Sequence, residues 1–231
     1  MTDQRLEGIK ACVFDAYGTL FDVNTAAKHC AGELGDKWQP LANMWRLRQL
    51  EYTWLRSLMG AYVDFWQVTA EALDFAMASL EIADKDGLRQ RLLDLYLQLD
   101  AYPEVPAVLK TLKAAGFKTA VLSNGSPEML QSAVDNAGIG DSLDAVLSVH
   151  SLGIFKPAPQ VYQMAVDTLA VAPDEISFQS SNAWDAHAAS HFGFRVAWIN
   201  RFGQARERMP GAPDVELTAL DELLPVLGAA A

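Results

Sequence analysis

Short apolar runs alternate with longer helical patterns in two parts of this chain. Five runs have the length and composition of buried strands, at residues 9–14, 118–122, 145–149, 176–179 and 195–199. Helical patterns begin near Val105, Pro127, Pro157 and Ala183. Strands that alternate with helices predict right-handed crossovers, so we expect an α/β fold with a Rossmann-like parallel sheet and helices on both of its faces.

Residues 23–99 contain no strand-like run and show helical spacing throughout. One apolar stripe consists of Met44, Leu47, Leu50, Trp54, Leu55, Leu58 and Met59, and a second of Phe65, Val68, Ala72, Leu73, Phe75 and Ala76. The pattern predicts a catalytic core at residues 1–22 and 100–231 with a helical cap inserted at residues 23–99. We interpret the first stripe as core or subunit interface rather than as a cofactor site.

The charge balance of the chain narrows the range of partners. Its 18 Lys and Arg residues against 29 Asp and Glu residues give a formal net charge of −11. Nucleic-acid binding and electrostatic membrane binding both need clustered basic residues, so neither is expected. No run approaches the roughly 18 apolar residues of a spanning helix, and residues 1–7 have no secretion-signal pattern. We therefore expect a cytoplasmic protein in which Cys12 and Cys30 are free thiols.

Each of the first four predicted strands leads to polar residues. The first leads to Asp15, the second to Ser123 and Asn124, the third to Lys156, and the fourth to Asp185. Open parallel sheets bind their ligands outside the carboxyl ends of the strands, so these side chains are expected to converge at one edge of the sheet. Two carboxylates, a hydroxyl, an amide and an ammonium group in one place indicate an active site.

Each of these strand ends also has a purely structural explanation. The alternatives are a turn at Asp15 and Gly18, a helix N-cap at Ser126 before Pro127, a capping box of Asn182 with Asp185, and an ordinary surface lysine at Lys156. Their joint placement, rather than any single residue, favours a functional site.

Four segments resemble the motifs of the haloacid dehalogenase superfamily: FDAYGTL at residues 14–20, LSNG at 122–125, KP at 156–157 and SSNAWD at 180–185. The insertion resembles that of the L-2-haloacid dehalogenase (type II) branch, with WR at 45–46 and QLEYTWLRSLM at 49–59. The likeness covers nearly the whole chain, in order. It implies a homodimer that uses no metal and no other cofactor.

The acidic residues separate this branch from the phosphatases of the same superfamily. Such a phosphatase has a second Asp two residues after the nucleophile and further carboxylates that hold magnesium. Here Tyr17 stands at the first of these positions, and Asp185 is the single acid of the fourth motif. A halide leaves as a stable anion, so it needs neither protonation nor a metal ion. A magnesium-dependent small-molecule phosphatase and a catalytically silent binding protein with this fold remain the alternatives.

The resemblance implies that the enzyme hydrolyses short-chain L-2-haloacids to D-2-hydroxyacids and halide, with inversion, through an ester on Asp15. Arg46 would receive the halide, because its guanidinium group offers several fixed donors. The remaining contacts to the halide and to the substrate carboxylate would come from Ala16, Tyr17, Arg46, Ser123 and Asn124.

The other motif residues would support the nucleophile. Lys156 would keep Asp15 ionised through its opposite charge. The groups that orient this pair would be Thr19, Tyr162, Ser180 and Asn182. Asp185 is the candidate for activating the hydrolytic water, with Lys156 or Asn182 as assistants. The apolar pocket around the alkyl group and halogen would be lined by Tyr17, Leu50, Phe65 and Trp184.

The histidines and the overall charge add two expectations. His187 and His191 are four residues apart in a predicted helix, and without an HExxH pattern we interpret them as an exposed pair rather than a metal site. The substrate is an anion and the chain is acidic, so recognition must be local. We expect a positive pocket at the strand ends, supplied by Arg46, Lys156 and the amides near Ser123.

Overall fold

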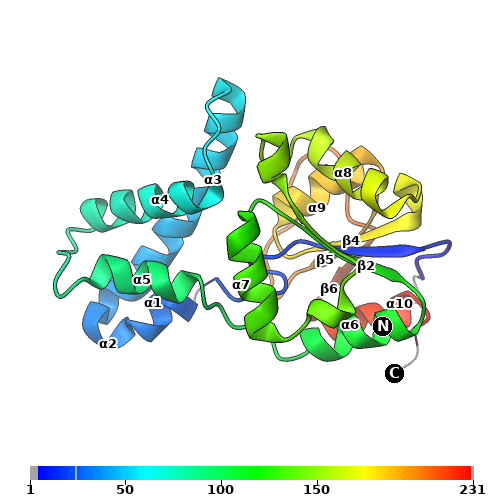
Figure 1. The fold of residues 1–231 in the computed structure, drawn as a ribbon, viewed down its shortest axis with the longest axis horizontal. Coiled ribbons are helices and arrows are strands. Elements are labelled where there is room, and N and C mark those ends of the chain that lie inside the picture. Colours follow the sequence, from blue (N-terminus) through cyan, green and yellow to red (C-terminus); the bar gives the residue numbers. More distant parts are fainter. Residues whose placement is uncertain (1–4, 24, 230–231) are drawn as a thin grey trace.

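The computed structural model describes residues 5–23 and 25–229. Figure 1 shows two parts, a sheet flanked by helices and a group of helices to its left. The outer limits of the predicted catalytic core, residues 1 and 231, lie outside the described residues. So do the first four of residues 1–7, the segment in which the sequence shows no secretion signal. None of the helices in the described part of the chain combines the length and apolar character needed to cross a membrane.

Six parallel strands form the sheet, in the order β3-β2-β1-β4-β5-β6. They span Ala11–Phe14 (β1), Lys118–Ser123 (β2), Ala145–Ser148 (β3), Ile176–Ser180 (β4), Arg195–Ile199 (β5) and Val215–Leu217 (β6). In the register of β1, Ala11 pairs with Lys118 of β2 and with Ile176 of β4. The five predicted strands are confirmed. β6 escapes prediction because its three residues are too few for a recognisable pattern.

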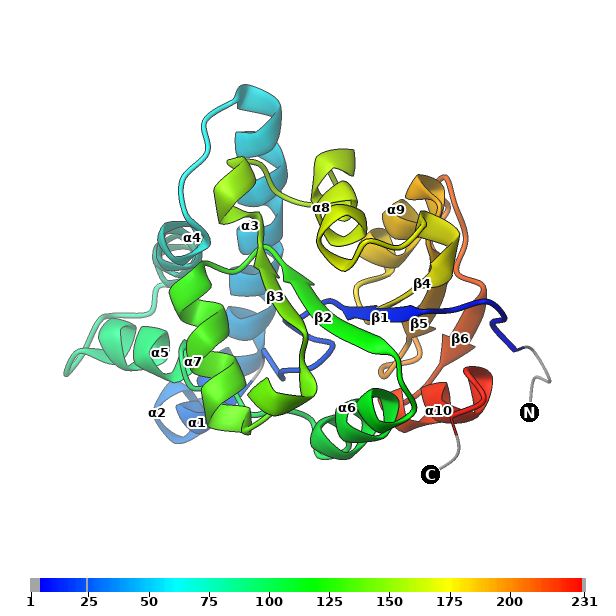
Figure 2. The same cartoon turned by 45° about the vertical axis from the view of Figure 1, so that its right-hand side comes forward.

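Helices cover both faces of the sheet (Figures 1 and 2). In both views α6 (Val105–Ala114) and α10 (Leu223–Val226) lie below the sheet, and α8 (Pro159–Leu169) and α9 (Ala183–Phe192) lie above it. α7 (Pro127–Ala137) packs against β3. Short 3-10 helices are found at Gly35–Lys37 (η1), Gly140–Ser142 (η2), Val149–Leu152 (η3), Pro173–Glu175 (η4) and Leu220–Glu222 (η5). The predicted fold class, a Rossmann-like α/β sheet with helices on both faces, is confirmed.

The ends of α7 show why local sequence locates these helices well. Ser126 caps the helix, as predicted, by accepting a hydrogen bond from the Met129 backbone N–H at 3.3 Å. Pro127 occupies the first turn, where its missing N–H is not needed. Gly138 follows at φ 63°, a left-handed conformation that favours glycine and ends the helix.

In the described residues five α-helices lie between β1 and α6, and we call them the cap helices. They are α1 (Thr25–His29), α2 (Ala31–Leu34), α3 (Trp38–Met59), α4 (Phe65–Ser79) and α5 (Leu88–Tyr96). The two connections to the sheet run side by side, because Phe21 and Ala101 form an antiparallel bridge and the Asp22 N–H donates to the Asp100 carbonyl at 3.0 Å. The boundaries between the predicted core and the predicted cap, after residue 22 and after residue 99, stay a prediction.

The buried face of α3 differs from the predicted one. Buried residues recur at every fourth position, at Leu41, Trp45, Gln49 and Thr53. The predicted first stripe is instead largely exposed, with Leu47 at 53%, Leu55 at 52%, Leu58 at 85% and Met59 at 74%. These four residues are not part of the core of a single chain, so the interpretation of the stripe as core is wrong for them. Their interpretation as a subunit interface stays a prediction. The second stripe, on α4, is buried apart from Phe75 at its edge.

Candidate active site

β1 stands where the strand order reverses, with β2 and β3 on one side and β4 to β6 on the other. Open parallel sheets bind ligands at such a switch point, outside the carboxyl ends of the strands. Asp15 directly follows β1, Ser123 ends β2 and Ser180 ends β4. The topology therefore brings three of the four predicted strand ends together.

The two carboxylate oxygens of Asp15 have unequal surroundings. Oδ2 accepts hydrogen bonds from Asn182 Nδ2 at 2.7 Å, Ser180 Oγ at 3.2 Å and Thr19 Oγ1 at 3.3 Å. Oδ1 accepts one hydrogen bond, from Lys156 Nζ at 3.1 Å. Oδ1 consequently keeps more of its lone-pair capacity and is the better placed nucleophile. A turn alone does not explain a carboxylate that is 6% exposed and bound to four donors.

Lys156 is a buried cation between two carboxylates. It is 1% exposed, and its Nζ donates to Asp185 Oδ2 at 2.7 Å as well as to Asp15. Burial favours the neutral amine, but Asp15 and Asp185 outweigh burial and raise the pKa of Lys156 above its ordinary value. The ammonium form is therefore held in place, and the explanation as a surface lysine is wrong.

Asp185 lies behind Lys156 and is completely buried. Its Oδ1 accepts a hydrogen bond from the Tyr162 hydroxyl at 2.7 Å. Burial raises the pKa of Asp185 to about 6, against the opposing effect of Lys156. Burial, and then Asp185, also raise the pKa of Tyr162 well above its usual value, so that the phenol remains a donor. A carboxyl that titrates near neutral pH suits a general base.

Asn182 links Asp15 to the cap helices. It occupies the N-cap of α9, yet its side chain makes no capping hydrogen bond. Its Nδ2 donates to Asp15 and to the Tyr17 carbonyl at 3.1 Å, while its Oδ1 accepts from Arg46 Nη2 at 3.3 Å. The capping-box explanation for Asn182 and Asp185 is therefore wrong, because both side chains are bound within the site.

The end of β2 forms the adjoining wall of the site. Ser123 is fully buried and accepts a hydrogen bond from the Gly125 N–H at 3.1 Å. Asn124 Oδ1 accepts from the Lys156 N–H at 2.9 Å, which holds the loop that carries the lysine. Gly125 is required here because a Cβ would lie 2.8 Å from a ring carbon of Tyr17.

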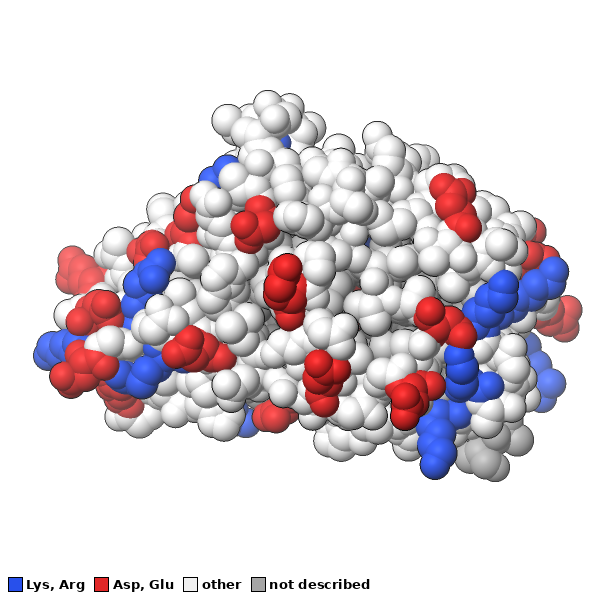
Figure 3. All heavy atoms as spheres, viewed as in Figure 1, with Lys and Arg blue, Asp and Glu red and all other residues white. Residues whose placement is uncertain are grey.

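Arg46 reaches this edge of the sheet from α3. Its Nη2 is 3.4 Å from the Tyr17 carbonyl oxygen and 3.3 Å from Asn182 Oδ1, and its Nη1 donates to Gln49 Oε1 at 2.8 Å. Two cations therefore lie near Asp15: Lys156, from the loop before α8, binds it directly, and Arg46, from α3, binds Asn182, which in turn donates to Asp15. On the face seen in Figure 3, acidic side chains spread across the middle and basic ones lie mostly toward the two ends.

The predicted apolar residues fall into two groups. Tyr17 contacts Phe65, with ring centroids 5.7 Å apart. Trp184 instead packs edge-on against Trp54 at 5.4 Å, beside an apolar cavity of about 490 Å³. Leu50 is half-buried on α3. The structure therefore brings Phe65 together with Tyr17, two residues after Asp15, and places Trp184 in the wall of the apolar cavity.

Three residues of this region are not among the site residues predicted from the sequence. Gln49 and Tyr96 are buried beside Arg46, and the hydroxyl of Tyr96 is 3.2 Å from Gln49 Oε1. Arg201 donates to the Thr19 carbonyl at 3.1 Å and forms an ion pair with Glu104 at 2.6 Å. A local signal existed for Arg201, which stands two residues after the end of β5, whereas the burial of Gln49 depends on how α3 packs and has no local signal.

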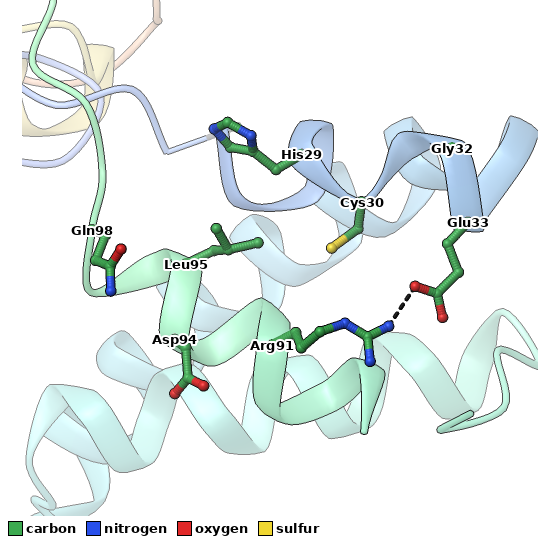
Figure 4. Close-up of a pocket in the computed structure, with 8 residues that line it drawn as sticks. All are labelled: His29, Cys30, Gly32, Glu33, Arg91, Asp94, Leu95 and Gln98. Atoms are coloured by element: carbon green, nitrogen blue, oxygen red, sulfur yellow. Dashed lines mark hydrogen bonds and ion pairs between the residues drawn. The ribbon is translucent and has the colours of Figure 1, made fainter. Parts of the chain in front are cut away.

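A second cavity lies among α1, α2 and α5 (Figure 4). It has a volume of about 500 Å³, and Arg91 and Glu33 form an ion pair at its wall. Burial raises the pKa of the Cys30 thiol there, so the thiol remains protonated near neutral pH. Cys12 and Cys30 are both free, as predicted.

The histidines do not form a metal site. In the described residues, no group of three or more His, Cys, Asp or Glu side chains could hold a metal ion. His191 is exposed but His187 is buried, so the interpretation as an exposed pair is wrong for His187. Gly211 packs against α9, where a Cβ added at Gly211 would lie 2.3 Å from the His187 carbonyl oxygen.

Comparison with known proteins identifies the family. The family model of the haloacid dehalogenase-like hydrolases matches residues 9–193, which include Asp15, Lys156 and Asp185. The chain belongs to the haloacid dehalogenase-like hydrolases. It is 49% identical to (S)-2-haloacid dehalogenase 1 of Pseudomonas sp. (strain CBS-3), over 94% of this chain and 96% of that one. It is 46% identical to (S)-2-haloacid dehalogenase 4A of Burkholderia cepacia, over 96% of each chain.

A solved structure gives the same result. The L-2-haloacid dehalogenase of Xanthobacter autotrophicus, with chloropropionic acid covalently bound, has a TM-score of 0.88 and 38% identity, and the match covers 96% of this chain and 100% of that one. The predicted superfamily and its L-2-haloacid dehalogenase branch are confirmed, as is a hydrolase of the (S)-2-haloacid dehalogenase type. These findings favour the dehalogenase over the phosphatase and the silent binding protein.

Proposed function

We propose that this dehalogenase hydrolyses short-chain L-2-haloacids to D-2-hydroxyacids and halide through an ester on Asp15, without a metal. The observation that carries the proposal is the unequal binding of the Asp15 carboxylate. Three donors bind Oδ2, whereas Oδ1 has Lys156 as its one hydrogen-bond donor. In this proposal the sheet part, residues 1–22 and 100–231, supplies the ester chemistry, and the cap, residues 23–99, supplies Arg46.

The first half-reaction forms the ester. Within the described chain the N–H groups of Ala16 and Tyr17 have no acceptor, so they are available to the substrate carboxylate together with Ser123. Asp15 Oδ1 attacks the carbon that carries the halogen from the side opposite the halogen, which inverts the configuration. The carbon–halogen bond breaks as its electron pair leaves with the halide, which Arg46 and Asn124 receive.

The second half-reaction hydrolyses the ester. Water attacks the acyl carbon of Asp15, and negative charge develops on Oδ2. The three groups already bound to Oδ2, from Thr19, Ser180 and Asn182, stabilise this oxyanion. Asp185 takes one proton of the water and passes it to the leaving alkoxide, so the hydroxyacid leaves with the original Oδ1 of Asp15 as its hydroxyl oxygen. Asp15 then releases the second proton of the water to solvent and is a carboxylate again.

A paired assay tests the proposed reaction. We expect halide release from L-2-chloropropionate to be unchanged by a chelator, because the halide leaves as an anion and Tyr17 stands where a phosphatase has its acid. Phosphate release from a generic ester with magnesium should be absent. Phosphate release alone would support the phosphatase alternative, and no release of either ion would support a silent binding protein.

Arg46→Lys should slow ester formation more than ester hydrolysis. Lysine keeps the charge but loses the planar fork that binds Asn182, the Tyr17 carbonyl and Gln49. We expect halide release in a single turnover to slow by about 10- to 100-fold, with ester hydrolysis changed by less than about threefold. Rapid-quench measurement of both products checks this, and the reverse pattern would remove Arg46 from the halide role.

Ester hydrolysis should fail as the pH falls through about 6, where Asp185 titrates. Above this pH Asp185 is a carboxylate and can accept a proton, and below it the acid cannot act as a base. Halide release should continue in the acid range while hydroxyacid formation slows. In Asp185→Asn, stopped-flow analysis should show a halide burst without turnover. A hydrolysis rate independent of pH across this range would contradict the role of Asp185.

The exposed apolar face of α3 supports a homodimer, with a second copy of this chain as the occupant. Leu47, Leu55, Leu58 and Met59 fall within about 120° of arc at 3.6 residues per turn. Leu58 also lines the apolar cavity beside Trp184, so the face continues into a hollow.

The chain acts in the cytoplasm, and its two unpaired cysteines support this location.

Leu58→Lys should therefore weaken the dimer. Leu58 is 85% exposed in the single chain, and a lysine buried there without a partner should raise the dissociation constant at least about 100-fold. Sedimentation velocity measures this, with Leu152→Lys, at a 40% exposed leucine outside α3, as the control. A wild-type monomer or an unchanged variant dimer would contradict the proposed interface.

A further inference from the structure

Gln49 is a buried amide in direct contact with Arg46. It is 1% exposed and lies one turn after Arg46 on the face of α3 that packs toward the other cap helices. Its Oε1 accepts from Arg46 Nη1 at 2.8 Å, and its Nε2 donates to Thr69 Oγ1 at 2.7 Å and to the Tyr96 hydroxyl at 3.1 Å. Every polar atom of the amide is thus occupied.

Proton accounting fixes the orientation of this amide. The guanidinium group of Arg46 can only donate, so Oε1 must face it. Thr69 uses its single hydroxyl proton on the Phe65 carbonyl at 2.7 Å, so its oxygen can only accept, and Nε2 must face Thr69. A glutamine fits both ends, whereas a carboxylate would place an acceptor against the lone pairs of Thr69.

Arg46 differs from the other arginines of the cap helices in the charge of its partners, because its acceptors are neutral. Four of them form ion pairs: Arg48 with Glu51, Arg56 with Glu71, Arg89 with Asp74, and Arg91 with Glu33. Among the described residues of the cap helices, Arg46 is the arginine without a carboxylate partner, and its acceptors are the Gln49 and Asn182 amides and the Tyr17 carbonyl.

We propose that Gln49 is a positioning residue that holds Arg46 toward the nucleophile while leaving its positive charge uncompensated. A neutral acceptor fixes one edge of the guanidinium group, and the opposite edge faces Tyr17 and Asn182 beside Asp15. A carboxylate in the same place would neutralise the charge that the departing halide needs. This inference rests on the proposed role of Arg46 as the halide acceptor.

The test compares Gln49→Glu and Gln49→Met with the wild type, using 2-chloropropionate and 2-bromopropionate. Chloride is the poorer leaving group and depends more on Arg46, so the ratio of bromide to chloride release rates should rise in both variants. We expect chloride release to slow by about 10- to 100-fold in Gln49→Glu and about 3- to 10-fold in Gln49→Met, with ester hydrolysis unchanged. A purely structural role would slow both substrates equally and leave the ratio unchanged.

The control is Gln39→Glu, which makes the same substitution at an exposed position in the first turn of α3. It should leave both rates and their ratio unchanged. If Gln49→Glu fails to fold, Gln49→Met decides alone, and an unchanged ratio there overturns the inference. If Arg46→Lys also leaves halide release unchanged, the proposed role of Arg46 has failed. A slow Arg46→Lys beside unaffected Gln49 variants would reject Gln49 alone.

Discussion

Asp15→Ala is expected to abolish halide release while leaving the fold intact. The variant loses the carboxylate oxygen that attacks the substrate in the proposed reaction, and the side chains bound to it in the wild type are hydrogen-bond donors that cannot replace it. Lys156 retains its ion pair with Asp185, so the substitution leaves no unpaired buried cation. We expect turnover to fall by about 10⁴-fold or more, as for removal of a covalent nucleophile.

Halide release under saturating substrate measures this effect, and circular dichroism with thermal unfolding verifies the fold. Asp135→Ala, at an exposed position of α7, is the matched control and should keep full activity. Substantial residual turnover in Asp15→Ala would mean that water attacks the substrate carbon directly, without an ester intermediate.

Lys156→Met is expected to impair both activity and stability. The substitution keeps the length of the side chain but removes the cation between Asp15 and Asp185. Two buried carboxylates then lack their shared partner, which should lower the free energy of unfolding by about 3–5 kcal/mol. The loss should be greatest at neutral pH and shrink as the pH falls, because protonation of the carboxyls removes the unpaired charge.

Denaturant unfolding at several pH values measures this loss, and halide release should fall by at least about 100-fold at neutral pH. The control is Lys113→Met, which breaks the half-exposed ion pair with Asp144. Its expected effect is below about 1 kcal/mol. Equal losses of stability in the two variants would contradict the description of Lys156 as a buried, doubly paired cation.

The sheet and the residues at its carboxyl edge can be predicted from sequence because the signals are local. Each of the first five strands is a short apolar run, and Asp15 and Ser123 stand directly at strand ends. Parallel topology then brings such ends together without further information. The same rule, applied to β5, also leads to Arg201.

The cap helices show where local pattern fails. The apolar residues of α3 suggest a buried face, yet Leu58 is exposed and the polar Gln49 is buried. Only the packing of α3 against α4 and α5 decides which face turns inward, and this information is not local. The structural alternatives for Lys156 and Asn182 likewise depend on contacts between residues far apart in the chain.

The most direct test of the central claim follows oxygen from labelled water under single-turnover conditions. With enzyme in excess over L-2-chloropropionate in ¹⁸O water, the ester mechanism predicts unlabelled hydroxyacid, because its oxygen comes from Asp15. The ¹⁸O should appear in the peptide that contains Asp15, as measured by mass spectrometry after proteolysis. Labelled hydroxyacid in the first turnover, with an unlabelled Asp15 peptide, would contradict the account.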